Sequence, residues 1–425
     1  MDPTTDVIAQ IVSRASSPGY EDWWAKVGHA GYCSSPVELR GRDGQGRSVK
    51  ILTRCKNRRA SVCPSCSALY SGDTWQLVHQ GISPLDSELL DGRPMVFATL
   101  TAPGFGAVHT AALNGGRCRP GTPDRCRHGV PIRCRSVHES DDVRLGEPLC
   151  PECYDYLRHV LFTWHAPQLW HRFTVRLRRL VRQRDRTARV SYVKVVELQR
   201  RGVPHFHAVI RLDDAAMPSA ALVALVHEAA ASVRLTVPSF GGELVALRFG
   251  TQTDVQPLLI TVGEGDDRRV ASYLAKYVTK SVSDFGLSPR RISPRAVAAL
   301  DLRPHVREIL WTVLTLAESP GPSEMARWLH TLGYRGHITT KTRAYSTTMG
   351  ALRAHRAEWR SAQAGADDDG AGANRGINEW RFIKVGHRNE GERLLAKTAD
   401  ARTRASRLAA REESACGGSE CEREG

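Results

Sequence analysis

The chain has 425 residues, of which 41% are hydrophobic and 25% charged. This length and composition are typical of roughly two to three globular domains and not of a disordered chain. Lys and Arg number 60 against 45 Asp and Glu, so the formal net charge of +15 favours nucleic acid or an anionic membrane as the partner. The sequence contains no apolar run of about 18 residues, and its first residues lack a signal-peptide pattern. We therefore expect a cytoplasmic protein without membrane association.

A first group of cysteines lies near the amino terminus. The motif CPSC contains Cys63 and Cys66, and Cys33 and Cys55 precede it. In a cytoplasmic chain such cysteines are more often metal ligands or free thiols than disulfides. Four thiolates suit a structural Zn²⁺ ion, and the two-residue spacing is the stronger part of the pattern. We predict an N-terminal zinc-binding region over residues 1–92, with free thiols as the alternative.

A second group of cysteines follows a short apolar strand predicted at residues 95–102. It occupies residues 115–153, where Pro, Gly and Arg dominate and few side chains could form a core. A bound metal is a common way to order such a segment. The group contains Cys118, Cys126, Cys134, Cys150 and Cys153, with His128 and His138 among them. We predict a second zinc site made by Cys126, Cys134, Cys150 and Cys153, with His128 as the first substitute; an unliganded surface insertion is the alternative.

Residues 193–212 read as a β-hairpin. Two apolar runs rich in β-branched residues flank a turn at residues 200–204. Alternation along a strand places His205 and His207 on one face and Phe206 on the other. Two imidazoles on one face offer nitrogen ligands to a divalent cation, and Glu197 on the partner strand supplies an oxygen if the hairpin register permits. The alternative is a sheet with two incidental histidines.

The elements around the hairpin indicate an α+β fold with an antiparallel sheet. An amphipathic helix at residues 170–186 precedes the hairpin, and a helix at 219–233, a strand at 245–249 and a helix at 270–281 follow it. The first of these helices carries arginines away from its apolar face, which suit either solvent or a nucleic-acid backbone. Its exposed arginines are predicted to be Arg172, Arg176, Arg179 and Arg186.

The helix at residues 270–281 carries two tyrosines. Tyr273 and Tyr277 are spaced i and i+4, so they share one face, and Lys276 and Lys280 each follow a tyrosine by three positions. A phenol is a poor nucleophile at neutral pH, but nearby cations and an electrophile polarised by a metal offset this. Combined with the histidine pair, the tyrosines suggest attack on a phosphodiester, giving a phosphotyrosine and a free 3′-hydroxyl. An ordinary basic amphipathic helix is the alternative.

Three motifs in this order resemble those of HUH endonucleases that initiate rolling-circle replication. They are FATLT (97–101), His205-Phe206-His207, and the overlapping VASYLAK (270–276) and LAKYVTK (274–280). The paired tyrosines resemble the two-tyrosine initiators of small phages and plasmids. RRASVCPSC, EPLCPECYDY and RGHITTKTRAYSTT are similar to segments of initiators from actinobacterial plasmids and integrative elements. The resemblance spans about residues 30–355.

The resemblance implies a ferredoxin-like catalytic domain that nicks one DNA strand at a replication origin with Mg²⁺ or Mn²⁺. His205 and His207 would be metal ligands and Tyr273 and Tyr277 nucleophiles, while Glu197 is nominated as third ligand on geometry. The DNA is expected to be duplex at the origin and single-stranded at the nick. Because no GxxxxGK[ST] motif is present, a host helicase must unwind the duplex, and a host polymerase extends the 3′-hydroxyl.

The predicted domains follow from these motifs. The nuclease domain is placed at residues 93–285, a helical DNA-binding region at 286–360, and a linker with a mobile charged tail at 361–425. A relaxase or transposase would use the same chemistry, although relaxases usually carry their tyrosine ahead of the histidines and such transposases are typically shorter. A non-catalytic, zinc-stapled DNA-binding protein is the alternative from another class.

Overall fold

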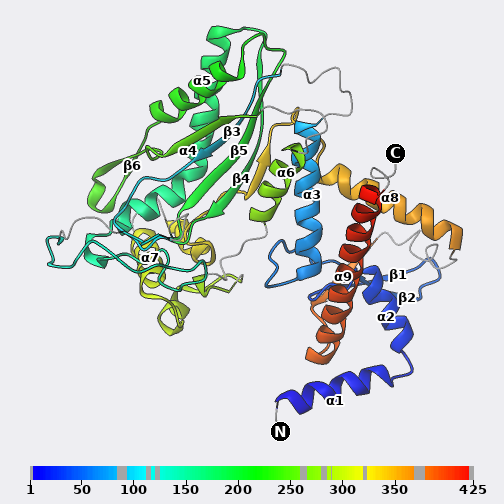
Figure 1. The fold of residues 1–425 in the computed structure, drawn as a ribbon. Coiled ribbons are helices and arrows are strands. Elements are labelled where there is room, and N and C mark those ends of the chain that lie inside the picture. The colour runs from blue at the N-terminus through cyan, green and yellow to red at the C-terminus, as the bar shows by residue number, and fades with distance from the viewer. Residues whose placement is uncertain are drawn as a thin grey trace. The chain divides into compact units, whose positions relative to one another are not determined.

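A computed structural model describes residues 3–83, 93–111, 116–119, 125–258, 266–278, 285–288, 290–318, 323–367 and 379–420 (Figure 1). The chain divides into two compact units. The first unit combines both ends of the chain, Met1–Asp73 and Met349–Gly425, and the second unit is Thr74–Thr348. Among the described residues, no helix is both long enough and apolar enough to cross a membrane.

The first unit contains a three-stranded antiparallel sheet built from both ends of the chain. Its strands lie in the order β10–β1–β2, so a strand that follows the predicted linker pairs with one near the amino terminus. Ala396 is buried against Trp23 and Val27, which ties the last helix to the second. The elements are α1 (Pro3–Ala15), α2 (Tyr20–His29), β1 (Val37–Arg42), β2 (Ser48–Thr53), the first half of α3 (Pro64–Ile82), α8 (Met349–Asp367), β10 (Arg381–Val385) and α9 (Glu390–Glu420).

The second unit contains a five-stranded antiparallel sheet in the order β8–β3–β5–β4–β9. In chain order, the four longer strands and two helices run β3, α4, β4, β5, α5, β8. The predicted α+β fold with an antiparallel sheet is confirmed. The elements are β3 (Met95–Leu100), α4 (Tyr156–Arg184), β4 (Arg189–Leu198), β5 (Pro204–Asp213), α5 (Ser219–Ser232), β6 (Leu235–Pro238), β7 (Leu244–Leu247), β8 (Thr253–Pro257), α6 (Asp266–Tyr277), α7 (Pro304–Ala317) and β9 (Thr339–Lys341).

The main core lies between one face of this sheet and helices α4 and α5. Phe206 on the central strand β5 is fully buried and stacks on Trp170 of α4, with ring centroids 5.5 Å apart. Phe173 and Leu177 continue the buried stripe of α4 at helical spacing, as the sequence predicted. Burial of Phe206 on this face places its neighbours His205 and His207 on the other face.

Neither of the two edge strands of the sheet, β8 and the short β9, was predicted from the sequence. The strand predicted at residues 245–249 exists as β7, but it pairs with β6 in a separate two-stranded sheet. The edge strand beside β3 is instead β8, whose sequence is TDVQP. Only Val255 of this strand is buried. An edge strand with one buried side chain has no alternation of apolar residues, which explains why the pattern did not reveal it.

Candidate active site and metal centres

The register of the β4–β5 hairpin brings the predicted cation ligands together. Glu197 of β4 lies directly opposite His205 of β5, and Val195 lies opposite His207. The turn is closed by a hydrogen bond from the Gln199 N–H to the Val203 carbonyl, at 2.9 Å. Glu197, His205 and His207 therefore all point away from the Phe206 face. The observed register is the one that the choice of Glu197 as a ligand required.

The three side chains form a compact group that could hold a divalent cation. One ligand atom from each of Glu197, His205 and His207 lies within 4.8 Å of the other two. The Nε2 atom of His207 is 3.5 Å from a carboxylate oxygen of Glu197, and its Nδ1 is 3.4 Å from the hydroxyl of Thr99 on β3. Within the described part of the chain, this buried Nε2 has no hydrogen-bond partner. Burial lowers the pKa of His205 to about 4, so its ring is neutral at pH 7, as a metal ligand must be. The group therefore fits a cation.

Both predicted tyrosines lie against this group. The Tyr277 ring stacks on His207 with centroids 4.9 Å apart, and the Tyr273 ring meets His207 edge-on at 5.6 Å. The two phenol rings are 4.8 Å apart. Tyr273 is 42% exposed, whereas Tyr277 is half-buried, and burial together with Tyr273 raises the pKa of Tyr277. Lys276 is exposed on the same helix, and Lys280 lies outside the described residues.

Helix α6 is fixed by its contacts with the second half of α3. The Trp75 indole N–H donates to the Ser272 hydroxyl at 3.1 Å. The His79 Nε2 lies 3.0 Å from a carboxylate oxygen of Asp267, and the rings of Trp75 and His79 stack at 4.4 Å. These contacts hold α6 at two points, so they set the position of the tyrosines over the sheet. These partners could not be predicted from local patterns because Trp75 and Ser272 are 197 positions apart.

The four cysteines predicted for the first zinc site are brought together in the first unit. One sulfur from each of Cys33, Cys55, Cys63 and Cys66 lies within 4.8 Å of the others. The Cys33 sulfur is 3.6 Å from that of Cys63 and 3.7 Å from that of Cys66. Zn–S bonds of about 2.3 Å in a tetrahedron place two sulfurs about 3.8 Å apart. The sulfur–sulfur distances in this group therefore match a tetrahedral zinc site.

The second predicted zinc group contains the substitute His128 in place of Cys134. Cys126, Cys150 and Cys153 lie together, but their fourth neighbour is His128, whose Nδ1 is 3.5 Å from the Cys150 sulfur and 3.3 Å from the Cys153 sulfur. Cys134 lies apart from these three. Its backbone pairs with Arg119 in an antiparallel bridge, which draws it toward another part of the insertion.

Cys134 belongs to a group that was not predicted from the sequence. Its neighbours are His109, Cys118 and His138. His138 follows Cys134 by four positions, a spacing that could have suggested a ligand pair, whereas His109 precedes the cysteines and carries no such signal. Among the described residues there are thus three groups that could bind zinc, one of four cysteines and two that mix cysteine and histidine, besides the group of two histidines and one glutamate.

Comparison with known proteins places these sites in a family context. Residues 19–401 match the family model described as the replication initiator protein of pSAM2, RepSA. The chain belongs to this family. It is also 37% identical to a replication initiator protein of Streptomyces ambofaciens, in an alignment that covers 97% of this chain and 96% of the relative. No solved structure matches. The family match spans the hairpin, the tyrosine helix and all three groups that could bind zinc.

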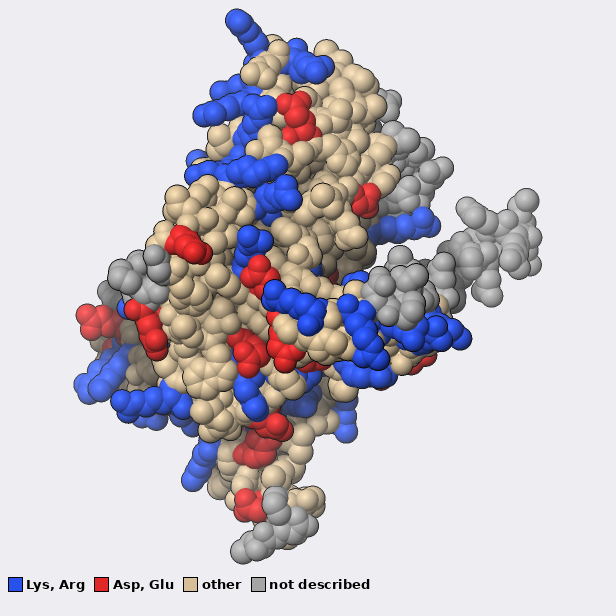
Figure 2. Space-filling view, turned by 90° about the vertical axis from the view of Figure 1, so that its left-hand side faces the viewer, with Lys and Arg blue, Asp and Glu red and all other residues tan. Residues whose placement is uncertain are grey.

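Arginine side chains line two hollows beside α4. A hollow of about 610 Å³ lies between α4 and the segment that joins α5 to β6, and a second of about 560 Å³ lies near the carboxyl end of α4. Figure 2 shows Lys and Arg side chains along the upper left of this face and others across its lower half, with acidic side chains interspersed. The first hollow is lined by Arg172, Arg176, Arg179 and Arg234, and the second by Arg93, Arg178, Arg182, Arg189, Arg211 and Arg343. Asp213 and Asp214 also line the second hollow, where they form ion pairs with three of its arginines.

Proposed function

We propose that this chain initiates rolling-circle DNA replication by nicking one strand at an origin. The observation that carries the proposal is the contact of both tyrosine rings with His207, Tyr277 stacked and Tyr273 edge-on, beside a group that also contains His205 and Glu197. A cation site and two hydroxyl nucleophiles on facing elements are the parts needed for transesterification of a phosphodiester. Membership of a replication initiator family gives this chemistry a DNA substrate.

The topology of the second unit supports an HUH endonuclease with a ferredoxin-like sheet. The chain order β3, α4, β4, β5, α5, β8 is a β-α-β-β-α-β arrangement, and the sheet order β8–β3–β5–β4 places the first strand beside the last. His205 and His207 then lie on a central strand, and α6 with its tyrosines covers the sheet face opposite α4 and α5. This is the arrangement expected from the three ordered sequence motifs.

The proposed reaction exchanges one phosphoester bond for another. The Tyr273 hydroxyl oxygen attacks phosphorus and loses its proton, a bond forms between phosphorus and the phenol oxygen, and the bond to the 3′-oxygen breaks. The 3′-oxygen leaves with its electron pair and takes up a proton, giving a 5′-phosphotyrosine and a free 3′-hydroxyl. Bound Mg²⁺ or Mn²⁺ would supply charge stabilisation to the phosphate at this point. Attack by a 3′-hydroxyl on the phosphotyrosine reverses the reaction and rejoins strands.

Tyr273 is proposed to attack first, and Tyr277 second. Tyr273 is the more exposed of the two, whereas burial raises the pKa of Tyr277. A phenol that is harder to ionise and less accessible is the weaker nucleophile. Lys276, exposed between them on α6, places positive charge near the scissile phosphate. With the first tyrosine linked to DNA, the second remains available for a later strand transfer.

The first arginine-lined hollow beside α4, which has no acidic residue among the described residues of its lining, is proposed to contact the DNA backbone. Arginine binds phosphate with two parallel N–H donors, and binding through phosphates weakens steeply with salt. The DNA would be duplex at the origin repeats and single-stranded at the nick. The chain has no Walker motif, so a host helicase would unwind the duplex and a host polymerase would extend the 3′-hydroxyl.

A nicking assay on supercoiled plasmid carrying the origin, with Mn²⁺, tests this proposal. The wild type should convert the plasmid to the open circle and form protein–DNA adducts that survive SDS. Replacing both Tyr273 and Tyr277 by Phe should abolish adducts, and His207→Ala should abolish nicking. Tyr192→Phe is the matched control, because Tyr192 lies on the same hairpin but packs against Trp170 on the other sheet face.

Three results would contradict the proposal. Adducts that persist in the double Phe variant would exclude the tyrosines as nucleophiles. Full nicking by His207→Ala would exclude the cation group. A wild-type protein that binds the origin with no nicking would favour the non-catalytic DNA-binding alternative. A relaxase or transposase of the same chemistry would instead cut a transfer origin or a transposon end in preference to the replication origin.

A further inference from the structure

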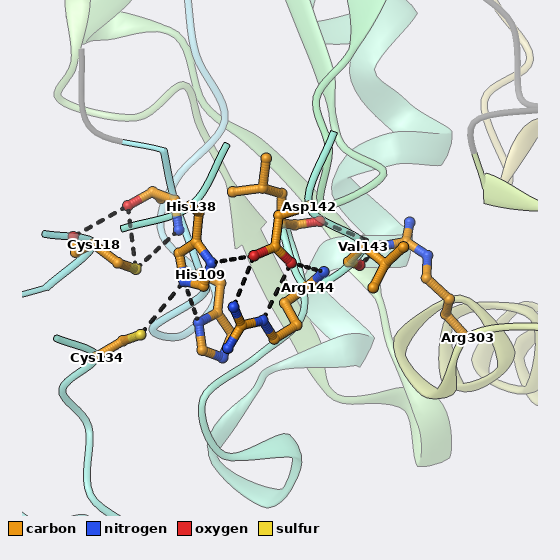
Figure 3. Close-up of polar contacts among 10 residues, drawn as sticks. His109, Cys118, Cys134, His138, Asp142, Val143, Arg144 and Arg303 are labelled. Atoms are coloured by element: carbon orange, nitrogen blue, oxygen red, sulfur yellow. Dashed lines mark hydrogen bonds and ion pairs between the residues drawn. The ribbon is translucent and has the colours of Figure 1, made fainter. Parts of the chain in front are cut away.

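Four side chains of the cysteine-rich insertion converge on one point. Figure 3 shows His109, Cys118, Cys134 and His138 directed toward one another. One ligand atom from each lies within 4.8 Å of the other three. Cys118 is 8% and His138 is 4% exposed, so two of the four are shielded from solvent. Such convergence of two imidazoles and two thiols is the ligand set of a tetrahedral Cys₂His₂ zinc site.

The distances between the ligand atoms match a tetrahedral ion. Zn–N bonds of about 2.0–2.1 Å and Zn–S bonds of about 2.3 Å place two nitrogens about 3.3 Å apart and a nitrogen and a sulfur about 3.5 Å apart. The Nδ1 of His109 is 3.1 Å from the Nε2 of His138, which is 3.4 Å from the Cys134 sulfur. A hydrogen bond between the two imidazoles would account for their own contact, but not for two sulfurs directed at the same point.

The groups behind the ligands orient them as in known zinc sites. The Nδ1 of His138 is 2.7 Å from a carboxylate oxygen of Asp142, so its Nε2 faces the other ligands with its lone pair. Asp142 is itself held by Arg144, whose backbone N–H donates at 2.9 Å and whose guanidinium donates at 2.8 Å. The Cys118 sulfur accepts from the Thr110 N–H at 3.2 Å, which stabilises a thiolate.

The same loop is fastened to the turn of the β4–β5 hairpin. The Arg200 guanidinium donates to the Ser140 carbonyl at 2.7 Å. Gly146, with φ of +88°, approaches the turn so closely that an added Cβ would lie 2.3 Å from the Arg200 carbonyl oxygen. From the other side, the Arg303 guanidinium donates to the Val143 carbonyl at 2.9 Å (Figure 3). The segment 138–147 thus joins the ligand His138 to the turn between Glu197 and His205.

We propose that His109, Cys118, Cys134 and His138 bind a structural zinc ion that anchors segment 138–147 against the turn of the β4–β5 hairpin. The ion would stabilise this Pro-, Gly- and Arg-rich insertion, which has little hydrophobic core of its own. Through the Arg200 and Gly146 contacts it restricts the turn that sets the spacing of Glu197 and His205. The inference concerns metal content and local stability, so it does not depend on whether the chain nicks DNA.

Zinc analysis of the full-length protein by inductively coupled plasma mass spectrometry tests the site. The double variant Cys118→Ser/Cys134→Ser should contain one zinc ion fewer per chain than the wild type. His138→Cys keeps four zinc-binding side chains and should retain the wild-type zinc content. Cys416→Ser in α9 and His171→Ala on the exposed face of α4 are matched controls that should lose none. Hydrogen exchange of a peptide over residues 198–206 should be faster in the double variant, while exchange of β1 and β2 stays unchanged.

Each outcome decides one part of the proposal. Unchanged zinc content in the double variant would overturn the site. Loss of one zinc ion with unchanged exchange at residues 198–206 would overturn the anchoring. If the double variant is insoluble, the single His109→Ala variant should release one zinc ion to EDTA at a lower concentration than the wild type does. Equal retention in that titration would overturn the site.

Discussion

Replacing Lys194 by Met should stabilise the second unit near neutral pH and remove a pH dependence of its stability. Lys194 of β4 is 3% exposed and lies among aromatic rings, with its Nζ 5.7 Å from the Trp170 centroid and 5.3 Å from that of Phe206. Its Nζ donates to the His337 carbonyl at 3.2 Å, and burial lowers its pKa to about 7. Burial in the folded state therefore disfavours the charged form of the Lys194 side chain.

The size and sign of the effect follow from the two pKa values. Between pH 7 and the ordinary lysine value near 10.5, the unfolded chain holds a proton that the folded chain has released, so stability rises with pH over this window. Well below pH 7, Lys194 is protonated in both the folded and the unfolded state, so its destabilising effect is at its largest and no longer changes with pH. Integration from pH 7 to pH 8 gives a rise of about 1 kcal/mol, and the whole window corresponds to about 5 kcal/mol.

Urea unfolding of wild type and variant at several pH values measures this contribution. The stability advantage of Lys194→Met should shrink by about 1 kcal/mol from pH 7 to pH 8, since other titrating groups cancel in the difference. The methionine side chain matches the apolar part of the lysine side chain in length, and the His337 carbonyl keeps its hydrogen bond from the Tyr334 hydroxyl at 3.2 Å. Lys397→Met, at an exposed position of α9, is the matched control. An advantage that does not change with pH would refute the assignment of the low pKa to Lys194.

Two further substitutions test contacts around the hairpin. Gly146→Ala should destabilise the second unit by about 1–3 kcal/mol, because both the positive φ and the nearby Arg200 carbonyl oppose a Cβ at this position. A thermal unfolding midpoint equal to that of the wild type would contradict the close approach of Gly146 to Arg200. Thr99→Val removes the hydroxyl that lies next to the Nδ1 of His207 and orients its ring, so Mn²⁺ binding measured by calorimetric titration should weaken about 10-fold. Unchanged affinity would show that Thr99 does not orient the ring.

The hairpin was predictable because alternation and the turn are local properties. The β-branched runs and the Gly202 turn lie within twenty residues, and period-two geometry then fixes which side chains share a face. The choice of Glu197 required the register as well, because a shift by one residue would have moved it to the Phe206 face. The structure pairs Glu197 directly with His205, a fact that spacing alone could not supply.

The assignment of the cysteines of the insertion to two groups was less predictable because it depends on how the backbone of the insertion pairs with itself. All the candidate ligands lie close in sequence, so several sets of four satisfy ordinary spacing. What separates Cys134 from Cys126 is a backbone pairing with Arg119, which has no side-chain signature. The pairing of β10 with β1 was hidden for the same reason, since strand partners more than 300 positions apart leave no local pattern.

The two halves of the candidate active site are held by different means, which explains why motif order predicted their composition but not their geometry. Glu197, His205 and His207 lie on paired strands, where the hydrogen-bonded ladder fixes the spacing between them. The tyrosines lie on a separate helix, whose position depends on side-chain contacts with α3 such as that between Trp75 and Ser272. The distance from nucleophile to cation site is therefore a property of tertiary packing, and it can change without any change in the three motifs.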